Sequence, residues 1–266
     1  LIADFDPVLG HQEHADAWRN FKTLASIKSR LSAEAKDRLQ MICSRHDARV
    51  GSMVRTLFQP LLQMALRKLV HDGQPDGSDF ASTPGLWPYL RRQGEAVGPK
   101  TLSWITTYPA AHHEKLCVVD DRVAFVGGLD LNHRRLDNTE HTDRQPWHDV
   151  ACRLQGDIAG YFGAHFRTRW NRERDDMLAR LDQLIAHGEA LNFDTAMVAE
   201  HRNTHALEAT ENTDIQLTTG RGIEAGLTAA EAPSIIPLRT VSQQAKSSFS
   251  RTPVPRDTGF LKAYLD

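Results

Sequence analysis

Residues 111–131, AHHEKLCVVDDRVAFVGGLDL, constrain the fold of this chain more than any other stretch. Within them, residues 114–119 and 122–127 are rich in Val and other apolar side chains, which predicts two strands. The polar pair Asp120-Asp121 falls between the two runs, where it is expected to turn the chain. The stretch therefore predicts a β-hairpin that ends in a double glycine.

His113 and Lys115 lie two positions apart at the start of the first expected strand. Side chains two apart on a strand point to the same face. One face then presents an imidazole, which can act as a nucleophile or carry a proton, beside a permanent cation that can hold an anionic group. This combination indicates a phosphate-handling pair.

The bulk composition limits the classes of protein to consider. With 266 residues, of which 40% are hydrophobic and 25% charged, the chain has the composition of an ordinary globular protein. Its net charge of -2 provides no overall positive field, so nucleic acid is a disfavoured partner and anion recognition must be local. The single cysteines Cys43, Cys117 and Cys152 suggest neither a disulfide framework nor a zinc site.

No run approaches the roughly 18 apolar residues of a membrane span, and the N-terminus lacks a basic-then-apolar signal segment. The sequence begins at Leu1, and we expect a fragment of a longer protein. The compartment is left open between a soluble protein, a peripheral membrane protein and a secreted bacterial effector.

The remaining hydrophobic pattern predicts alternating helices and strands, which is an α/β fold with a mixed sheet flanked by helices on both faces. Ser32 is expected to cap a helix that runs to about Arg45 with Leu39 and Ile42 inward. Further strands are expected over residues 49–58, 101–108 and 147–154. Helices are expected within residues 14–31, with Ala17, Phe21, Leu24 and Ile27 inward, from Gly156 to about Trp170, and over residues 174–187.

At the hairpin the chain resembles the phospholipase D superfamily, whose signature is a His-x-Lys-x-x-x-x-Asp run followed by a Gly-Gly or Gly-Ser turn. The matching residues are His113, Lys115, Asp120, Gly127 and Gly128. The resemblance covers roughly residues 101–171 and includes RRLDNTEH and PWHDVACRLQGDIAGYFGAHFRTRWN. It implies that residues 1–233 form the first of two phospholipase D-like lobes. Residues 234–266 would then be the start of a second lobe, which is truncated.

The resemblance also implies a mechanism. His113 would attack the phosphorus of a phosphodiester to give a phosphohistidine, and Lys115 would hold the non-bridging oxygens. Water or another alcohol would then resolve the intermediate, and a histidine of a second motif would protonate the leaving group. No metal or other cofactor is implied.

Three aspartates are candidates for supporting roles. Asp120 is an odd number of positions from His113 and Lys115, so on a regular strand it faces away, and we expect it to hold the turn into Arg122. Asp149, on the later expected strand, resembles the aspartate that orients the nucleophilic histidine. Asp130 follows the double glycine and is grouped with Gly127 and Gly128 as substrate-binding, the glycines supplying backbone geometry and close approach to phosphate.

Neighbouring polar residues are given simpler interpretations. On a strand, His112 and His148 would point away from the proposed site, so a structural or surface role is expected for both. Arg134, Arg135 and the charged run at residues 167–174 could bind anionic headgroups, but a solvated face is the expectation.

The sequence contains a single His-x-Lys pair, so half of such an active site is missing. The second motif would come from a missing C-terminal part or from a homodimer partner. The leading function is hydrolysis or transphosphatidylation of glycerophospholipids at a membrane surface. The alternatives are a cardiolipin-synthase-like phosphatidyltransferase, a nuclease of the same superfamily, which the near-neutral charge disfavours, and a catalytically silent lobe that acts as a binding module.

Overall fold

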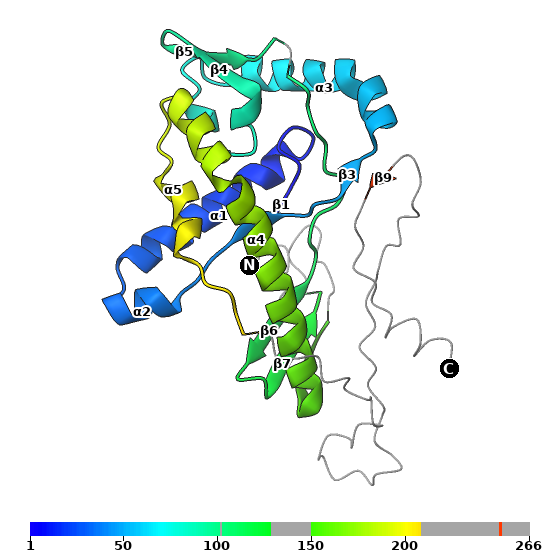
Figure 1. Ribbon diagram of the computed structural model, residues 1–266, viewed down its shortest axis with the longest axis vertical. Helices are drawn as coiled ribbons and strands as arrows, with labels where there is room; N and C mark the ends of the chain where they lie inside the picture. The colour runs from blue at the N-terminus through cyan, green and yellow to red at the C-terminus, as the bar shows by residue number, and fades with distance from the viewer. Residues whose placement is uncertain (102, 129–149, 209–249, 252–266) are drawn as a thin grey trace, which may run out of the picture. The chain divides into compact units, whose positions relative to one another are not determined.

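The computed structural model describes residues 1–101, 103–128, 150–208 and 250–251 (Figure 1). The chain divides into two compact units. The first contains Leu1–His112 and Trp170–Ala206, and the second contains His113–Arg169. The expected boundary after residue 233 and the expected second lobe lie outside the described residues, apart from Ser250–Arg251. That division therefore stays a prediction.

In the first unit, β1 (Ile2–Asp4) pairs in parallel with β2 (Cys43–Arg45), and α1 (His11–Ser29) packs beside them. The α1 face that is buried contains Ala17, Trp18 and Phe21, two of which were expected there. Leu24 and Ile27, by contrast, are 40% and 48% exposed, so their inward placement was wrong. At this end of the helix the inner position belongs to Lys28, which forms an ion pair of 2.8 Å with Glu200.

The next helix begins where the sequence predicted. The Ser32 hydroxyl accepts a hydrogen bond of 3.3 Å from the Ala35 backbone N–H, which caps α2 (Ala33–Arg38). The helix is shorter than expected because residues 43–45 leave it to pair with β1. Ile42 is nonetheless buried, as predicted, whereas Leu39 is only half-buried.

The strand expected over residues 49–58 is wrong. Only β3 (Arg49–Val50) is extended, and it pairs with β9 (Ser250–Arg251). From Ser52 the chain forms α3 (Ser52–Asp72), which continues through Pro60. Its buried side chains, Leu62 and Leu66, recur at the helical interval, and this period overrides the loose alternation that suggested a strand.

The strand expected over residues 101–108 is also wrong, because residues 103–108 are irregular. Side chains of α3 take the place of a neighbouring strand. Gln59 donates to the Ile105 carbonyl at 2.7 Å and accepts from the Ile105 N–H at 3.0 Å, and Gln63 donates to the Ser103 carbonyl. Backbone groups that would otherwise require a sheet are thus satisfied by amide side chains.

The rest of the first unit consists of short elements around a buried cluster. The hairpin of β4 (Leu90–Gln93) and β5 (Ala96–Pro99) follows the 3-10 turns η1 (Ser78–Phe80) and η2 (Trp87–Tyr89). Near the end of the described chain lie α5 (Ala196–Ala199) and η4 (Glu200–Asn203). The fully buried side chains in this region include Phe80, Leu86, Trp87 and Leu90.

The second unit is built on an antiparallel sheet of three strands in the order β6-β7-β8. These are β6 (Lys115–Val119), β7 (Val123–Gly127) and β8 (Ala151–Gln155), close to the three strands expected here. Asp120 and Asp121 turn the chain between the first two, with φ of 51° and 54°. The predicted hairpin is confirmed.

One long helix follows this sheet instead of the two expected. After Gly156, at φ 86°, α4 (Asp157–Ala190) runs for 34 residues without a proline to break it. Ala159, Ile158 and Phe162 from its first turns pack against the β-sheet residues Ala124, Leu154, Val118 and Val126. The opposite face of the sheet, which includes Cys117 and Phe125, is exposed.

The α/β class is confirmed. Within the described part of the chain the strands form four small sheets, one of which is a parallel pair and the others antiparallel.

Candidate active site

The phosphate-handling pair lies at the beginning of β6. His113 immediately precedes the strand and is exposed, whereas Lys115 is its first residue and is half-buried. Nε2 of His113 lies 2.5 Å from Nζ of Lys115, so the two side chains share one face, as strand alternation predicts. Because an ammonium can only donate, Nε2 must accept, and its lone pair points into the space that Lys115 occupies. A single anionic group placed there would contact both.

Gly127 lies in the same row of the sheet as Lys115. It pairs with Lys115 on one side and with Ala151 on the other. A Cβ at this position would collide with the Val150 carbonyl and would lie 2.5 Å from the Ala151 Cα. The next residue, Gly128, donates its N–H to the Val150 carbonyl at 3.0 Å. In the described structure the double glycine therefore allows β8 to approach β7 closely at the end where Lys115 lies.

Glu114, between the two motif residues, points the other way. Its carboxylate accepts from Nε2 of His165 at 2.9 Å and lies 2.5 Å from Nη1 of Arg169. Both partners are on α4, four positions apart and hence on neighbouring turns of one face. These contacts attach the beginning of β6 to α4 through Glu114. His113 and Lys115 lie on the opposite face.

The turn at the far end of the hairpin is held by a second contact to α4. Both carboxylate oxygens of Asp121 accept from Nη1 of Arg167, at 2.9 and 2.8 Å. We expected Asp120 to hold this turn. Asp120 does lie in the turn, where the Arg122 N–H donates to the Val119 carbonyl at 3.0 Å, but the ion pair with Arg167 is formed by its neighbour Asp121.

These contacts correct the expectation that residues 167–174 form a solvated face. The side chains of Arg167 and Arg169 are only 18% and 9% exposed, and each pairs with a carboxylate of the hairpin. Sequence reasoning missed Glu114, Asp121 and His165 because their partners are distant in the sequence, and no local pattern indicates such pairs.

His112 belongs to the first unit, and its side chain is only 7% exposed. Its Nε2 lies 3.0 Å from Oε1 of Glu173, whose other oxygen accepts from the Ser44 hydroxyl at 2.6 Å. Burial would raise the pKa of Glu173, but His112, Ser44 and Arg172 together lower it to about 2. The His112 ring also lies 4.8 Å from the His46 ring, where burial and the nearby His112 lower the pKa of His46. The expected structural role for His112 fits this packing.

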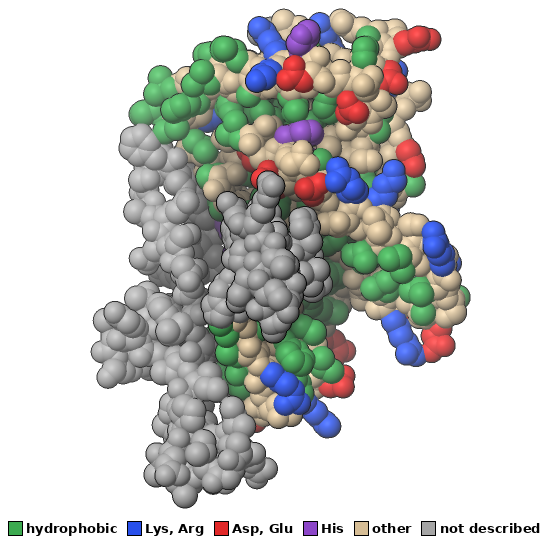
Figure 2. Space-filling view, turned by 180° about the vertical axis from the view of Figure 1, so that it is seen from behind, with side chains coloured by type: hydrophobic (Ala, Val, Ile, Leu, Met, Phe, Trp, Pro, Cys, Tyr) green, Lys and Arg blue, Asp and Glu red, His purple; other side chains and the backbone are tan. Residues whose placement is uncertain are grey.

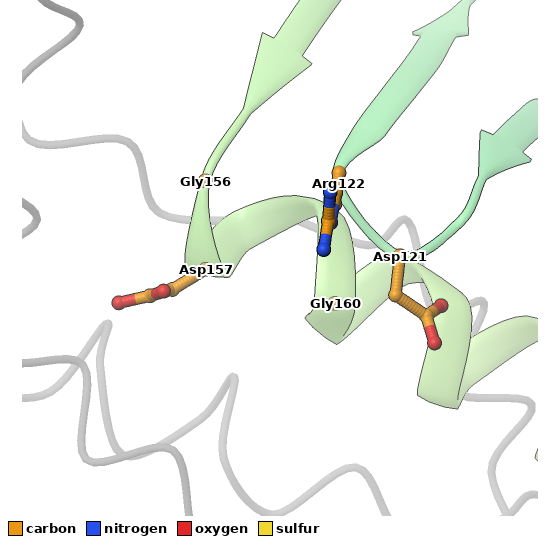
Figure 3. Close-up of a pocket in the computed structure, with 5 residues that line it drawn as sticks. All are labelled: Asp121, Arg122, Gly156, Asp157 and Gly160. Atoms are coloured by element: carbon orange, nitrogen blue, oxygen red, sulfur yellow. The ribbon is translucent and has the colours of Figure 1, made fainter.

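A hollow of about 510 Å³ lies at the turn end of the second unit (Figure 3). Asp121 and Arg122 line it from the hairpin turn, and Gly156, Asp157 and Gly160 line it from the beginning of α4. Since β6 runs away from His113 and Lys115 toward this turn, the hollow is at the other end of the strand from the reactive pair.

Other candidate residues fall outside the described part of the chain. Asp130, Asp149, His148, Arg134 and Arg135 belong to residues 129–149, and their expected roles stay predictions. Among the described residues, no group of three or more His, Cys, Asp or Glu side chains could hold a metal ion. No described helix is both long and apolar enough to cross a bilayer.

The curated proteins with similar sequences that are described below are all named phospholipase D. The chain is 33% identical to phospholipase D alpha 2 of Arabidopsis thaliana over an alignment of 112 residues, which covers 27% of this chain and 14% of that protein. It is 32% identical to phospholipase D zeta 1 of the same plant over 102 residues, covering 24% and 9%, respectively. Phospholipase D C of Dictyostelium discoideum is 31% identical over 101 residues, covering 24% and 6%.

No family profile and no solved structure matches the chain. The chain is similar to these phospholipases D over about a quarter of its length, and the matches support the phospholipase D superfamily and a phosphodiesterase-like function. The matched region spans 14% or less of these three relatives.

Proposed function

We propose that this chain supplies one half of the active site of a phospholipase D-type enzyme that hydrolyses or transphosphatidylates glycerophospholipids. The observation that carries the proposal is the 2.5 Å approach of His113 Nε2 to Lys115 Nζ on the face of the sheet opposite α4. The relatives, which are named as phospholipases D, support the choice of phospholipid among phosphodiesters.

The reaction divides into two displacements at phosphorus. Nε2 of His113 uses its lone pair to form a bond to phosphorus, and the bond from phosphorus to the headgroup oxygen breaks. The departing oxygen takes a proton from the acid of the second motif, which then acts as a base. That base removes a proton from water or an alcohol as its oxygen attacks phosphorus, and the phosphorus–nitrogen bond breaks to restore His113.

Lys115 contributes electrostatically to both displacements. In the described structure its ammonium faces the nucleophilic nitrogen, where the non-bridging oxygens of a bound phosphodiester would accept its hydrogen bond instead. Negative charge on those oxygens persists through each displacement, and a fixed cation stabilises it without reorganisation. When a phosphate oxygen replaces the His113 imidazole as the partner of Lys115, the lone pair on Nε2 of His113 also becomes free to attack.

The supporting roles are part of the same proposal. With Nε2 as the acceptor, the neutral ring of His113 has its proton on Nδ1, and we assign Asp149 to accept that proton and raise the basicity of the ring. Gly127, Gly128 and Asp130 are assigned to the substrate side, and Asp120 to the turn. The second motif is assigned to another part of a longer polypeptide, with a second copy of this chain as the alternative source.

The test is turnover of phosphatidylcholine by the full-length protein, with and without a primary alcohol, together with trapping of a labelled phosphatidyl group on the protein. His113→Asn is expected to abolish headgroup release and the acid-labile, base-stable label. His205→Asn, which changes an exposed histidine, is the matched control and is expected to retain both.

Several results would overturn the proposal. Absence of headgroup release from any phospholipid by the full-length protein would exclude the lipid reaction, and faster cleavage of DNA than lipid would favour the nuclease. Transfer of a phosphatidyl group from one phospholipid to a hydroxyl group of another would favour the cardiolipin-synthase-like transferase. Unchanged activity in His113→Asn would favour a catalytically silent lobe.

A further inference from the structure

Helix α3 of the first unit carries a stripe of large apolar side chains that the described structure leaves uncovered. Met53, Leu57, Leu61 and Met64 recur every three or four residues and are 60%, 72%, 57% and 65% exposed. Phe58, at 50% exposure, lies beside the stripe. In Figure 2 hydrophobic side chains gather at the upper left, over the end of the molecule where Figure 1 shows α3. The stripe, Phe58 and Trp104 are together called the α3 face below.

The opposite side of α3 is buried, so the exposed stripe is not a sign of a detached helix. Leu62 and Leu66 are 4% and 0% exposed. Gln59 holds the neighbouring segment through two hydrogen bonds to the backbone of Ile105, at 2.7 and 3.0 Å. Helix α3 is therefore packed in place on one side and exposes apolar side chains on the other. A helix that only covers a core usually has a polar outer side.

Trp104 extends the exposed surface from the neighbouring segment. Its side chain is 51% exposed, and the Arg55 guanidinium lies 5.4 Å from its ring centroid. Arg55 also donates to the Thr106 hydroxyl at 3.3 Å, which fixes this segment against α3. Tryptophan with an apolar body and a polar ring N–H is enriched where water meets lipid.

The charge of α3 has one sign over most of its length. Arg55, Arg67 and Lys68 lie between Ser52 and His71, and no Asp or Glu occurs in that span. Lys68 follows Met64 by four positions, so it continues the line of the stripe, and Arg67 and Lys68 are both exposed. The protein as a whole has a net charge of -2, which makes this helix a local cationic feature.

We propose that the α3 face docks onto the surface of a membrane that contains anionic phospholipid. The apolar stripe would lie in the interface with the helix axis parallel to the membrane plane, and Arg67 and Lys68 would contact headgroup phosphates. This inference deepens the proposed function, on which it rests for its purpose, by giving the enzyme a means to reach lipid substrate. The binding itself does not depend on His113.

Charge complementarity favours lipid over a second copy of the chain. In a two-fold dimer the same α3 face would meet itself, and neither copy would bring an acidic side chain from Ser52–His71 to pair with Arg67 or Lys68. Anionic headgroups satisfy both cations and accept the apolar stripe at once. A surface of this composition matches the interfacial amphipathic helix, in which apolar burial and attraction to anionic lipid add.

The experiment is flotation of the full-length protein with vesicles of phosphatidylcholine alone and of phosphatidylcholine with phosphatidylglycerol in equal parts. The protein is expected to float with the anionic vesicles, and added salt is expected to weaken this binding. The double variant Leu57→Gln/Leu61→Gln should bind at least about tenfold more weakly, since each leucine would lose the burial of its side chain. The double variant Arg67→Gln/Lys68→Gln should lose the preference for anionic vesicles.

Leu9→Gln is the matched control, because Leu9 belongs to the same unit and is 65% exposed but lies outside the α3 face. It should bind like the unchanged protein. Because every substituted side chain is exposed, circular dichroism is expected to show unaltered folding. His113→Asn should abolish turnover and leave flotation intact, so failure of catalysis and failure of docking are distinguished.

Two outcomes would overturn the inference. One is equal flotation of the unchanged protein and Leu57→Gln/Leu61→Gln. The other is absence of flotation together with a dimer, seen by analytical ultracentrifugation, that Leu57→Gln/Leu61→Gln dissociates and Leu9→Gln does not. That second pattern would assign the α3 face to another copy of the chain.

Discussion

The carboxylate of Glu114 accepts a hydrogen bond of 2.9 Å from Nε2 of His165. Glu114 separates the two motif residues, and His165 belongs to the part of α4 in the second unit. The Glu114 carboxylate also pairs with Arg169, so it has two partners, His165 and Arg169, on one helix. The contact fixes the strand start from the side opposite His113 and Lys115, so it acts on the reactive pair only through the backbone.

Glu114→Gln is therefore expected to lower phospholipid turnover by the full-length protein by about tenfold while costing no more than about 1 kcal/mol of stability, since the pair is partly exposed. A loosened strand start should lower kcat more than it raises KM. Steady-state turnover and urea unfolding check the two parts. Glu189→Gln, an exposed change elsewhere on α4, is the control, and equal kinetics for the two variants would contradict a positioning role.

Gly127→Ala is expected to destabilise the second unit by about 1–3 kcal/mol, because the new Cβ would collide with the backbone of Val150 and Ala151. The same collision should push β8 away from the end of the sheet where Lys115 lies, and lipid turnover should fall with stability. Chemical denaturation measures the first effect. Gly98→Ala is the matched control in a strand, because a Cβ there meets nothing within 4 Å. A Gly127 variant as stable as the Gly98 variant would show that β8 can move without cost.

Local signals in the sequence were sufficient to predict the β6–β7 hairpin and the Ser32 cap of α2. The apolar runs on either side of Asp120-Asp121 determine β6 and β7, and the Ser32 side chain reaches only as far as Ala35. Such features depend on residues a few positions apart, and a single sequence displays them directly.

The contacts that hold the candidate site could not be predicted in this way. Glu114 and His165 are 51 positions apart, and Asp121 and Arg167 are 46 positions apart. The same reason explains the missed irregular segment at residues 103–108, whose backbone is satisfied by Gln59 of α3. Only the fold brings such partners together, so the run of arginines on α4 resembled a solvated face.

Asp121→Asn is expected to lower the free energy of unfolding by about 0.5–1 kcal/mol, because it removes the charge that pairs with Arg167 while preserving side-chain size. Asparagine tolerates the positive φ of 54° at this position, so the backbone of the turn should not change. Asp120→Asn, at φ 51°, is the neighbouring control and should cost less. Urea denaturation at low and high salt checks both, and the Asp121 effect should shrink with salt. A larger cost for the Asp120 variant would assign the anchoring role to that residue, as the sequence first suggested.

Glu173 is expected to make the first unit sensitive to acid. Its pKa is about 2 when folded, against an ordinary value of 4.5, because His112, Ser44 and Arg172 offset the effect of burial. A carboxyl with a lowered folded pKa contributes stability that is fully present above the unfolded value and is lost as pH falls through the folded value. The contribution should therefore decline from about pH 4.5 to about pH 2, and the shift corresponds to about 3 kcal/mol.

Glu173→Gln isolates this effect, because glutamine keeps the side-chain shape but cannot titrate. The variant should be less stable at neutral pH, where the buried His112 and Ser44 lose their carboxylate partner, and its stability should change less between about pH 4.5 and 2. Denaturant unfolding across this pH range is the measurement. The exposed Glu189→Gln should retain the acid dependence of the unchanged protein. A Glu173 variant with the same slope of stability against pH would mean that other carboxyl groups cause the acid sensitivity, and that the buried contact of His112 contributes through packing rather than charge.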